Sequence, residues 1–194
     1  MTHALIVFAH PCSESLSSTL HNVVVEALTA RGWTIDDLDL YAENFSPVLT
    51  ERERRGYHQE PTNIEPVRAY VERLRAAEAL ILVFPVWNFG YPAILKGFFD
   101  RVFLPGVSFK LIDGKVRPNL QNIKKLAAVT TYGGTRLRAL MAGDPPRRLV
   151  KRHLRYVCHQ SAVMKYLALY DMNRAVTEDH KRFISKVKAS MQTF

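Results

Sequence analysis

Short apolar runs of strand length recur along the chain and alternate with segments of helical periodicity. The runs Ala4–Ala9 and Ala79–Phe84 are continuously apolar, which is typical of strands buried on both faces of a parallel sheet. Thr34–Leu40, Lys125–Thr131 and Ala162–Tyr170 are the other segments that predict strands. The pattern therefore predicts five strands, distributed over the whole chain.

The segments between these strands carry the apolar spacing of amphipathic helices. Apolar residues from Leu16 to Leu28 recur at i, i+4, i+7 and i+8, and Gly32 suits the position just after that helix. Pro92 is expected at the first position of the next clear helix, whose apolar face extends to Phe103. The remaining segments are Val67–Leu74, a helical region broken at Pro145-Pro146, the closing helix Thr177–Met191, and an irregular excursion over residues 41–66.

The regular alternation of strand and helix indicates the fold class. Each strand-helix-strand unit implies a right-handed crossover between parallel strands. We therefore expect an α/β fold, a doubly wound five-stranded parallel sheet with helices on both faces. Pro85 cannot donate to a ladder and is expected to end its strand. No linker or repeat divides the 194 residues, which predicts a single domain over residues 1–194.

The charge balance favours anionic ligands. Lys and Arg number 27 against 18 Asp and Glu, which gives a formal charge of +9. Phosphate-bearing cofactors and the anionic surface of a membrane would both be attracted by this field. The basic stretch from Arg147 to Arg155 has helical spacing but no nucleic-acid recognition motif, so it predicts a solvated helix face and no nucleic-acid partner.

Other features of the sequence indicate the cellular compartment that we expect for the protein. The longest apolar stretch, Ala79–Trp87, is about half the length of a membrane span. The N-terminus lacks the basic region and the cleavage site of a secretory signal. Cys12 and Cys158 form no C-x-x-C pair. We expect a cytoplasmic protein without a transmembrane segment or a bound metal, and peripheral contact with a membrane stays open.

Ligands of a doubly wound sheet bind beyond the carboxyl ends of its strands. Three loops are expected there: His10–Ser18, Pro85–Pro92 and Thr130–Arg136. The chain contains no G-x-G-x-x-G after its first strand, no P-loop, no G-x-S-x-G elbow and no H-E-x-x-H helix. These absences disfavour a nicotinamide-binding Rossmann domain, a P-loop nucleotidase, an α/β-hydrolase and a zinc protease.

The first loop is short and rich in hydroxyl groups, and it leads directly into a helix. Free backbone N–H groups, the positive end of the helix dipole and serine hydroxyls together make an anion site. Alternatively, Ser13, Ser15 or Ser17 only caps the helix, and His10 is only a polar residue at the end of a strand. The residues of this loop, taken alone, leave both interpretations open.

The other two loops suit a flat ligand. Trp87, Phe89 and Tyr91 put three aromatic rings between a strand and a helix, where they fit a flat aromatic ligand. They could instead cover the sheet edge or form a subunit contact. Gly133 and Gly134 permit close approach of a ligand to the backbone, although a plain tight turn would also account for them.

Three stretches of this sequence resemble one known family. They are AHP followed by a serine-rich turn, FPVWNFGYPAILKGFFDRVF, and TTYGG. Together they are similar to the flavodoxin-like NAD(P)H:quinone oxidoreductases, the group that includes mammalian quinone reductase, the bacterial modulator-of-drug-activity reductases and the ancillary flavoproteins of potassium efflux systems. The resemblance extends from the N-terminus to about Thr135, and the C-terminal third matches only in its strand-helix pattern.

The resemblance implies a flavin, FMN or FAD, bound non-covalently across the three loops. The flavin phosphate and ribityl chain would lie at the first loop, and the isoalloxazine ring would lie between the second and the third. The residues that match the family's cofactor-binding positions are His10, Ser15, Leu16, Ser17, Pro85, Val86, Trp87, Asn88, Phe89, Thr130, Thr131, Tyr132, Gly133 and Gly134.

The resemblance also implies a reaction and an assembly. NADH or NADPH would transfer hydride to flavin N5, and the flavin would pass it to a quinone or a similar small acceptor in alternating steps. Family members share their sites between the subunits of a homodimer, and Phe109 matches an aromatic that reaches across toward the substrate. Trp87 and Phe89 would contact the substrate as well. The reaction requires no side-chain nucleophile or acid/base pair, so no catalytic residue is assigned.

Two departures from the family pattern and two alternatives accompany this interpretation. Tyr132 stands inside the usual T-T-G-G, and the tyrosine and histidine that some members carry after that loop have no counterpart, so Arg136 or Arg138 is a candidate for supplying positive charge there. Azo, nitro or free-flavin reduction would use the same residues. The alternative from another class is a flavin-binding regulatory subunit that docks on a membrane transport protein.

Overall fold

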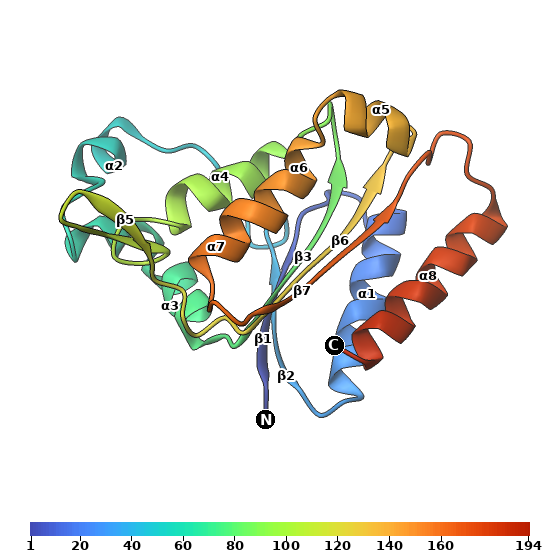
Figure 1. The fold of residues 1–194 in the computed structure, drawn as a ribbon, viewed down its shortest axis with the longest axis horizontal. Helices are drawn as coiled ribbons and strands as arrows, with labels where there is room; N and C mark the ends of the chain where they lie inside the picture. Colours follow the sequence, from blue (N-terminus) through green and yellow to red (C-terminus); the bar gives the residue numbers. More distant parts are fainter.

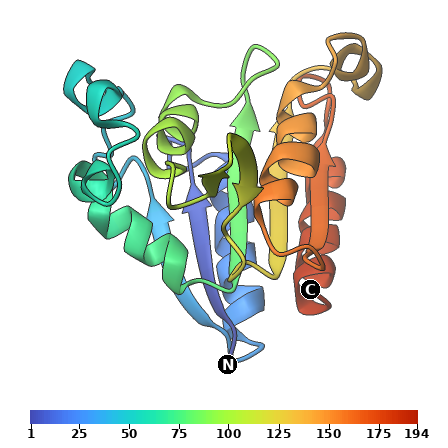
Figure 2. The same cartoon turned by 60° about the vertical axis from the view of Figure 1, so that its left-hand side comes forward.

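A five-stranded parallel sheet forms the centre of the molecule in the computed structural model, which describes all residues from 1 to 194. Its strand order is β2-β1-β3-β6-β7, visible from left to right in Figure 2. Every neighbouring pair is parallel. The doubly wound sheet of the sequence analysis is therefore confirmed, with strands β1 (His3–Phe8), β2 (Thr34–Asp39), β3 (Ala79–Val86), β6 (Lys125–Tyr132) and β7 (Val163–Leu169).

Helices cover both faces of the sheet (Figure 1). Helices α1 (Leu16–Thr29) and α8 (Thr177–Gln192) pack on one face through residues such as Val24 and Val187. The opposite face is covered by α3 (Arg68–Ala76), α4 (Ala93–Val102) and the segment formed by α6 (Pro145–Arg148), the π-helical turn η2 (Leu149–Leu154) and α7 (Arg155–Val157). Strand β3 is buried along its whole length because helices flank it on both faces.

The end of β3 differs from the expectation that Pro85 terminates it. The strand continues through Pro85 to Val86, and Pro85 lies opposite Thr131 of β6. The N–H of Ala9 donates to the carbonyl of Val83, so residues 83 and 85 turn their backbone groups toward β1. Because the β1 pairing ends opposite Val83, the missing N–H of Pro85 costs no ladder hydrogen bond.

Two other prolines lie at the start of a helix, Pro92 at α4 and Pro145 at α6. Pro92 is the N-cap of α4, with an extended ψ of 140°, and is not the first helical residue. Its carbonyl accepts the N–H of Lys96 at 3.0 Å. The helical region is interrupted between α5 and α6 as expected, and Pro145 begins α6, since a proline is well suited to the first turn.

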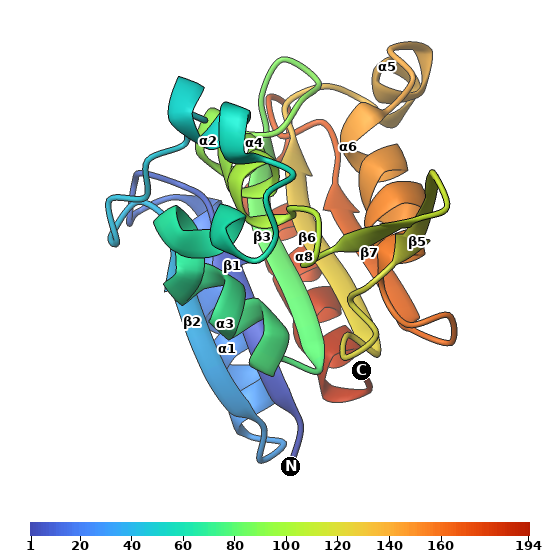
Figure 3. The same ribbon diagram turned by 90° about the vertical axis from the view of Figure 1, so that its left-hand side faces the viewer.

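The structure adds elements that the periodicity does not predict. Strands β4 (Phe109–Ile112) and β5 (Lys115–Pro118) form an antiparallel hairpin beside α7 (Figure 3). Asp113 and Gly114, with φ of 50° and 71°, form its turn, a dipeptide that favours hairpins. The excursion over residues 41–66 contains α2 (Glu51–Gly56) and the first residues of the 3₁₀ helix η1 (Thr62–Val67), and α5 (Arg136–Met141) follows β6.

Candidate functional site

Four loops meet at the carboxyl edge of the sheet and enclose a hollow of about 290 Å³. The three loops expected from the sequence all contribute, together with the loop that joins β7 to α8. The residues that line the hollow are His10, Ser15, Leu16, Ser17, Pro85, Val86, Trp87, Thr131, Gly133, Met172 and Asn173. Nine of these eleven were expected, and Met172 and Asn173 were not.

The first loop supplies hydrogen-bond donors at the start of α1. The Ser15 hydroxyl accepts the N–H of Ser18 at 3.1 Å, so the capping interpretation is confirmed for this serine. The N–H groups of Leu16 and Ser17 have no acceptor in the protein, as expected for the first turn of a helix. Ser17 is buried, and its side chain lines the hollow. Capping therefore leaves two amides and one hydroxyl available.

His10 adds a further donor to this end of the hollow. The N–H of Cys12 donates to His10 Nδ1 at 3.0 Å. A neutral imidazole that accepts at Nδ1 carries its proton on Nε2. In this tautomer the imidazole presents an N–H donor on the side of the ring away from Cys12; in the other tautomer Nδ1–H would donate to the Cys12 carbonyl oxygen, which lies 3.2 Å from Nδ1.

The second loop folds as a tight turn with strained backbone. Trp87 and Gly90 exchange two backbone hydrogen bonds, of 3.2 and 2.8 Å. The two central residues, Asn88 and Phe89, have φ of 49° and 55°. A positive φ is uncommon for a bulky residue such as Phe89. Their N–H groups donate to no protein acceptor. Trp87 and Phe89 stay 42% and 38% exposed, so the turn displays both rings at the surface.

The third and fourth loops are held against each other. Asp171 donates its N–H to the carbonyl of Gly134 at 2.8 Å, and Met172 donates to that of Tyr132 at 3.0 Å. A Cβ atom at Gly133 would lie 3.2 Å from Oδ1 of the exposed Asn173 side chain. The N–H groups of Gly133 and Gly134 have no protein acceptor.

Several expected site residues lie outside the hollow. Asn88, Phe89 and Gly134 flank it; the Phe89 ring lies 3.8 Å from where a Gly134 side chain would begin. Thr130 is buried with its hydroxyl unpaired. The Tyr132 side chain is 1% exposed and belongs to the core on the side of α4 and α6, so it offers the site only its backbone.

Phe109 and the two candidate arginines are also outside the hollow. Phe109 lines a separate hollow with Tyr57, Phe99 and Phe103. Arg136 and Arg138 belong to α5, and the aliphatic stem of Arg138 lies beside Gly134. Within one chain, Phe109 therefore lies apart from the other expected residues.

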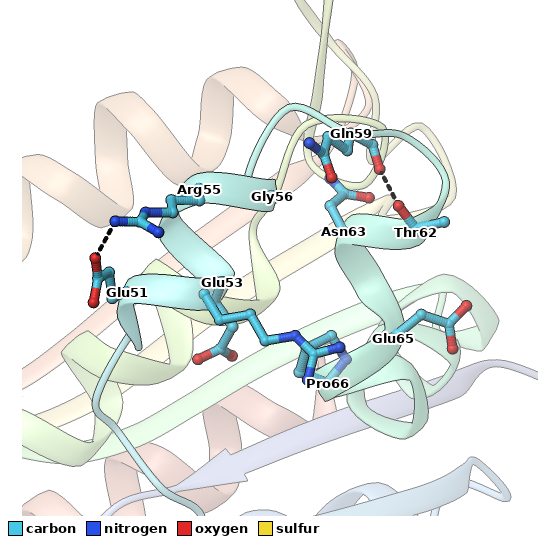
Figure 4. A pocket seen from close by; sticks show the side chains of 10 residues that line it. Glu51, Glu53, Arg55, Gly56, Gln59, Thr62, Asn63, Glu65 and Pro66 are labelled. Carbon is cyan, nitrogen blue, oxygen red and sulfur yellow. Dashed lines mark hydrogen bonds and ion pairs between the residues drawn. The ribbon is translucent and has the colours of Figure 1, made fainter.

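A hollow between α2 and η1 has a different chemistry, shown in Figure 4. Its lining includes no hydrophobic side chain, and its charged groups include the exposed pair Glu51 and Arg55, 2.5 Å apart. None of the four loops contributes to it. The hollow at the sheet edge is therefore the stronger candidate.

The candidate site offers donors and aromatic surface instead of acid–base chemistry. Its lining contains no carboxylate, lysine or arginine, and His10 is the ionisable side chain. Residues at the start of α1 with free amides and a free hydroxyl line it together with Trp87 and Gly133, and the free amides of Asn88, Phe89 and Gly134 flank it. This arrangement fits an anionic group joined to a flat ring system.

The chain belongs to the flavodoxin-like fold family, whose model matches residues 2–192. It is 35% identical over 146 residues to NAD(P)H dehydrogenase [quinone] 1 of Rattus norvegicus, covering 67% of this chain and 53% of that protein. The chain thus spans only about half the length of this curated relative.

Solved structures agree on the fold. Smu.1420 from Streptococcus mutans UA159 has a TM-score of 0.87 at 27% identity, with both chains fully covered. An FMN-dependent NADH-azoreductase from Bacillus anthracis, solved in complex with FMN, has a TM-score of 0.80 at 16% identity, covering 100% of this chain and 99% of that one. At this identity the second likeness concerns the fold alone.

Proposed function

We propose that the hollow binds a flavin and that the protein is an NAD(P)H oxidoreductase that reduces a quinone or a similar small acceptor. One observation carries the proposal. Residues with unpaired donors at the start of α1 and Gly133, with its unpaired amide, line one hollow at the strand ends where doubly wound folds bind ligands, and the unpaired amides of Asn88, Phe89 and Gly134 flank it. The quinone reductase relative supports the reaction class, and the FMN-bound azoreductase supports the cofactor.

The first loop would hold the flavin phosphate. Leu16 and Ser17 offer backbone N–H groups, the Ser17 hydroxyl offers a further donor, and His10 would offer Nε2–H in the tautomer that accepts the Cys12 N–H. Charge-assisted hydrogen bonds to a phosphate are stronger than neutral ones, and the dipole of the fourteen-residue helix α1 adds to them. We assign the phosphate-binding role to these three residues and helix capping to Ser15.

The second and third loops would hold the ring system. Asn88, Phe89, Gly133 and Gly134 have N–H groups without protein acceptors, which suit the carbonyl oxygens and ring nitrogens of an isoalloxazine. Gly133 allows the close approach that such contacts require. The Trp87 indole would lie along the ring or beside the acceptor. Fixed amides stabilise developing negative charge without reorganisation.

A bound flavin supplies the hydride chemistry, accepting two electrons from NADH or NADPH and passing them on. The residues of this chain bind and orient. They would anchor the phosphate through the first loop and the ring edge through the amides of the second and third loops. This division of labour explains why the lining lacks a carboxylate and why no side chain is assigned as catalytic.

We also propose a homodimer that completes the site. The volume of about 290 Å³ is at the lower end of the range for cofactor sites, roughly 300–1,000 Å³. Leu111, Ile112 and Val116 on the β4–β5 hairpin are about half exposed, and such surfaces mark interfaces. A twofold partner could cover them and bring its own Phe109 over the site, a self-complementary arrangement.

A regulatory subunit is the second candidate, and α5 supports it. Leu137, Leu140 and Met141 are 66%, 66% and 79% exposed, beside Arg136 and Arg138. This apolar and basic surface suits docking on an anionic partner or membrane surface. No helix of the structure has both the length and the apolar character that crossing a bilayer requires. The free thiols of Cys12 and Cys158 suit a reducing compartment such as the cytoplasm.

Turnover distinguishes the two candidates. The purified protein, loaded with FMN or FAD, is mixed with NADH or NADPH and a soluble quinone, and oxidation of the nicotinamide is followed. Tens of turnovers per second support the enzyme, since the median for enzymes is about 10 per second. Tight flavin binding with fewer than about one turnover per minute would favour the regulatory subunit. Azo and nitro compounds tested in parallel define the acceptor.

A further inference from the structure

A cluster of three tyrosines and one aspartate lies directly below the Gly133–Gly134 loop. We call Tyr132, Asp144, Tyr166 and Tyr170 the tyrosine cluster. Tyr132 Oη donates to Asp144 Oδ1 at 2.7 Å and lies 2.6 Å from Tyr166 Oη. Tyr170 Oη donates to Asp144 Oδ2 at 3.4 Å, and its ring packs against that of Tyr132 with centroids 4.5 Å apart and planes tilted by 31°. The cluster thus connects the ends of β6 and β7 with the start of α6.

The hydrogen atoms of the cluster have a single consistent arrangement. A tyrosine hydroxyl has one proton to donate, and that of Tyr132 goes to Asp144. Tyr166 must therefore donate to Tyr132. Burial, reinforced by the neighbouring Tyr166, raises the pKa of Tyr132 above its ordinary value, so this donor persists across the physiological pH range. The Arg147 guanidinium, 5.1 Å from the Tyr166 ring centroid, faces the same group.

Asp144 is held in an unfavourable backbone conformation by these contacts. Its φ is 43° and it is nearly fully buried. Such a conformation costs free energy and persists where the surroundings determine it. Backbone hydrogen bonds from Asp144 to Ala139 (2.8 Å) and from Arg148 to Asp144 (3.0 Å) hold this conformation. The hydrogen bonds from Tyr132 and Tyr170 to the carboxylate add to them. The carboxylate is thereby fixed under the last residue of β6.

The cluster is continuous with the candidate site through the backbone. Tyr132 precedes Gly133, and its carbonyl accepts the N–H of Met172, which lines the hollow. Tyr170 precedes Asp171, whose N–H donates to the carbonyl of Gly134. Any displacement of the Tyr132 side chain would therefore move both loops that form this side of the hollow.

We propose that Tyr132 is a positioning residue that, through Asp144 and Tyr166, sets the place of the Gly133 and Gly134 amides against the ligand's ring system. The inference rests on the proposed function only in taking that ring system to be a flavin. It accounts for the extra tyrosine between Thr131 and Gly133, whose side chain turns away from the hollow. It also separates this loop, which would act on the ring, from the α1 loop, which would act on the phosphate.

The test compares Tyr132→Phe and the milder Tyr166→Phe with Asn122→Ala. Asn122 lies at the opposite edge of the sheet and donates to the carbonyls of Leu74 and Ala77 at 2.9 and 2.8 Å, so its loss lowers stability without touching the site. Amide hydrogen exchange is measured on the ligand-free proteins. Affinities for lumiflavin, riboflavin and FMN, and the visible spectrum of each bound flavin, are measured on all four proteins.

We expect Tyr132→Phe to speed exchange by about tenfold or more at Asp171 and Met172, whose N–H groups donate to the carbonyls of Gly134 and Tyr132. The variant should bind all three flavins more weakly by a similar factor, about tenfold, and the absorption band of the bound flavin should shift. Tyr166→Phe should act in the same direction with a smaller effect, which keeps the test valid if Tyr132→Phe folds poorly. Asn122→Ala should lower the melting temperature and leave exchange at these amides and flavin affinity unchanged.

Two results would overturn the inference. One is exchange at the Asp171 and Met172 amides that is as slow in both tyrosine variants as in the wild type. The other is a lowered melting temperature with wild-type flavin affinities and spectra, which is what a purely structural role gives. If the wild-type protein binds no flavin, the proposed function fails, whereas the exchange measurements still decide whether Tyr132 positions the loop.

Discussion

The imidazole of His10 lies edge-on to the indole of Trp87, with ring centroids 5.7 Å apart and planes 62° apart. His10 follows β1 and Trp87 follows β3, so the contact joins the loop assigned to the phosphate with the loop assigned to the flavin ring. It also limits the motion of an indole that is 42% exposed. The first and second loops of the candidate site are therefore in contact through these two rings.

This contact leads to the first prediction, for Trp87→Ala. Loss of the indole removes aromatic contact with a flavin ring, worth about 0.5–1.5 kcal/mol. We expect riboflavin and FMN to bind roughly threefold to tenfold more weakly, with Trp87→Phe close to wild type. Fluorescence titration measures both flavins. If the affinity for FMN falls and that for riboflavin does not, Trp87 lies at the phosphate and not at the ring.

The second prediction concerns Gly97 in α4. A Cβ atom there would lie 2.2 Å from the carbonyl oxygen of Pro47 and 2.4 Å from its Cα, contacts that neither backbone can relieve by a rotamer change. We expect Gly97→Ala to destabilise the protein by about 1–3 kcal/mol, despite the higher helix propensity of alanine. Urea unfolding measures this, with the exposed Lys96→Ala as control. Unchanged or increased stability would show that the Pro47 segment moves freely.

The third prediction is a pH dependence at Glu53. The Glu53 carboxylate and the Arg101 guanidinium, both about nine-tenths buried, lie 2.5 Å apart and join α2 to α4. Burial raises the pKa of Glu53, but hydrogen bonds from Thr50 and Arg101 outweigh it, and the net shift is downward. A carboxyl whose pKa is lower in the folded state stabilises above its unfolded pKa, about 4.3, and this stabilisation is lost as the pH falls through the folded pKa.

The corresponding measurement is urea unfolding of wild type and Glu53→Gln between about pH 3 and pH 7. We expect the free-energy difference between the two proteins to be largest near pH 7 and to shrink below about pH 4. Arg101→Met, which leaves Glu53 buried and unpaired, should cost about 3 kcal/mol at neutral pH. A difference that is independent of pH would show that Glu53 does not titrate in this pair.

The fourth prediction tests the proposed dimer through Phe109. In a dimer that shares its sites, Phe109→Ala should lower quinone turnover severalfold while FMN affinity stays within about twofold, because Phe109 lies outside the flavin hollow of its own chain. Leu111→Glu on the exposed hairpin should shift the protein toward monomer in sedimentation. A fully active wild-type monomer at micromolar concentration would contradict this arrangement.

Much of the fold is predictable because its signals are local. The run Ala79–Phe84 is continuously apolar, and this property follows from burial on both faces. Pro85 misleads because its effect depends on where β1 ends, which no local pattern records. The hairpin was predictable in principle from Asp113-Gly114, a recognised turn signal, although its strands are only four residues long.

The site was predictable where a loop carries distinctive residues. Met172 and Asn173 have no distinctive chemistry, and only their position after β7 could have indicated them, since the carboxyl ends of parallel strands share one edge. Tyr132, in contrast, is a distinctive residue whose side chain does not line the hollow. Strand alternation places its side chain with Leu126 and Ala128, opposite to Thr131, so the period of two could have predicted that the side chain turns away from the hollow.

The measurement that tests the central claim most directly compares FMN with riboflavin, which lacks the phosphate. Both are titrated against the wild-type protein and against the double variant His10→Ala, Ser17→Ala, with melting temperatures recorded. The substitutions remove donors worth about 1–3 kcal/mol each. We predict that the wild type binds both flavins and that the variant loses one to three orders of magnitude in FMN affinity with almost unchanged riboflavin affinity. No flavin binding by the wild type, or equal losses for the two flavins, would contradict the account.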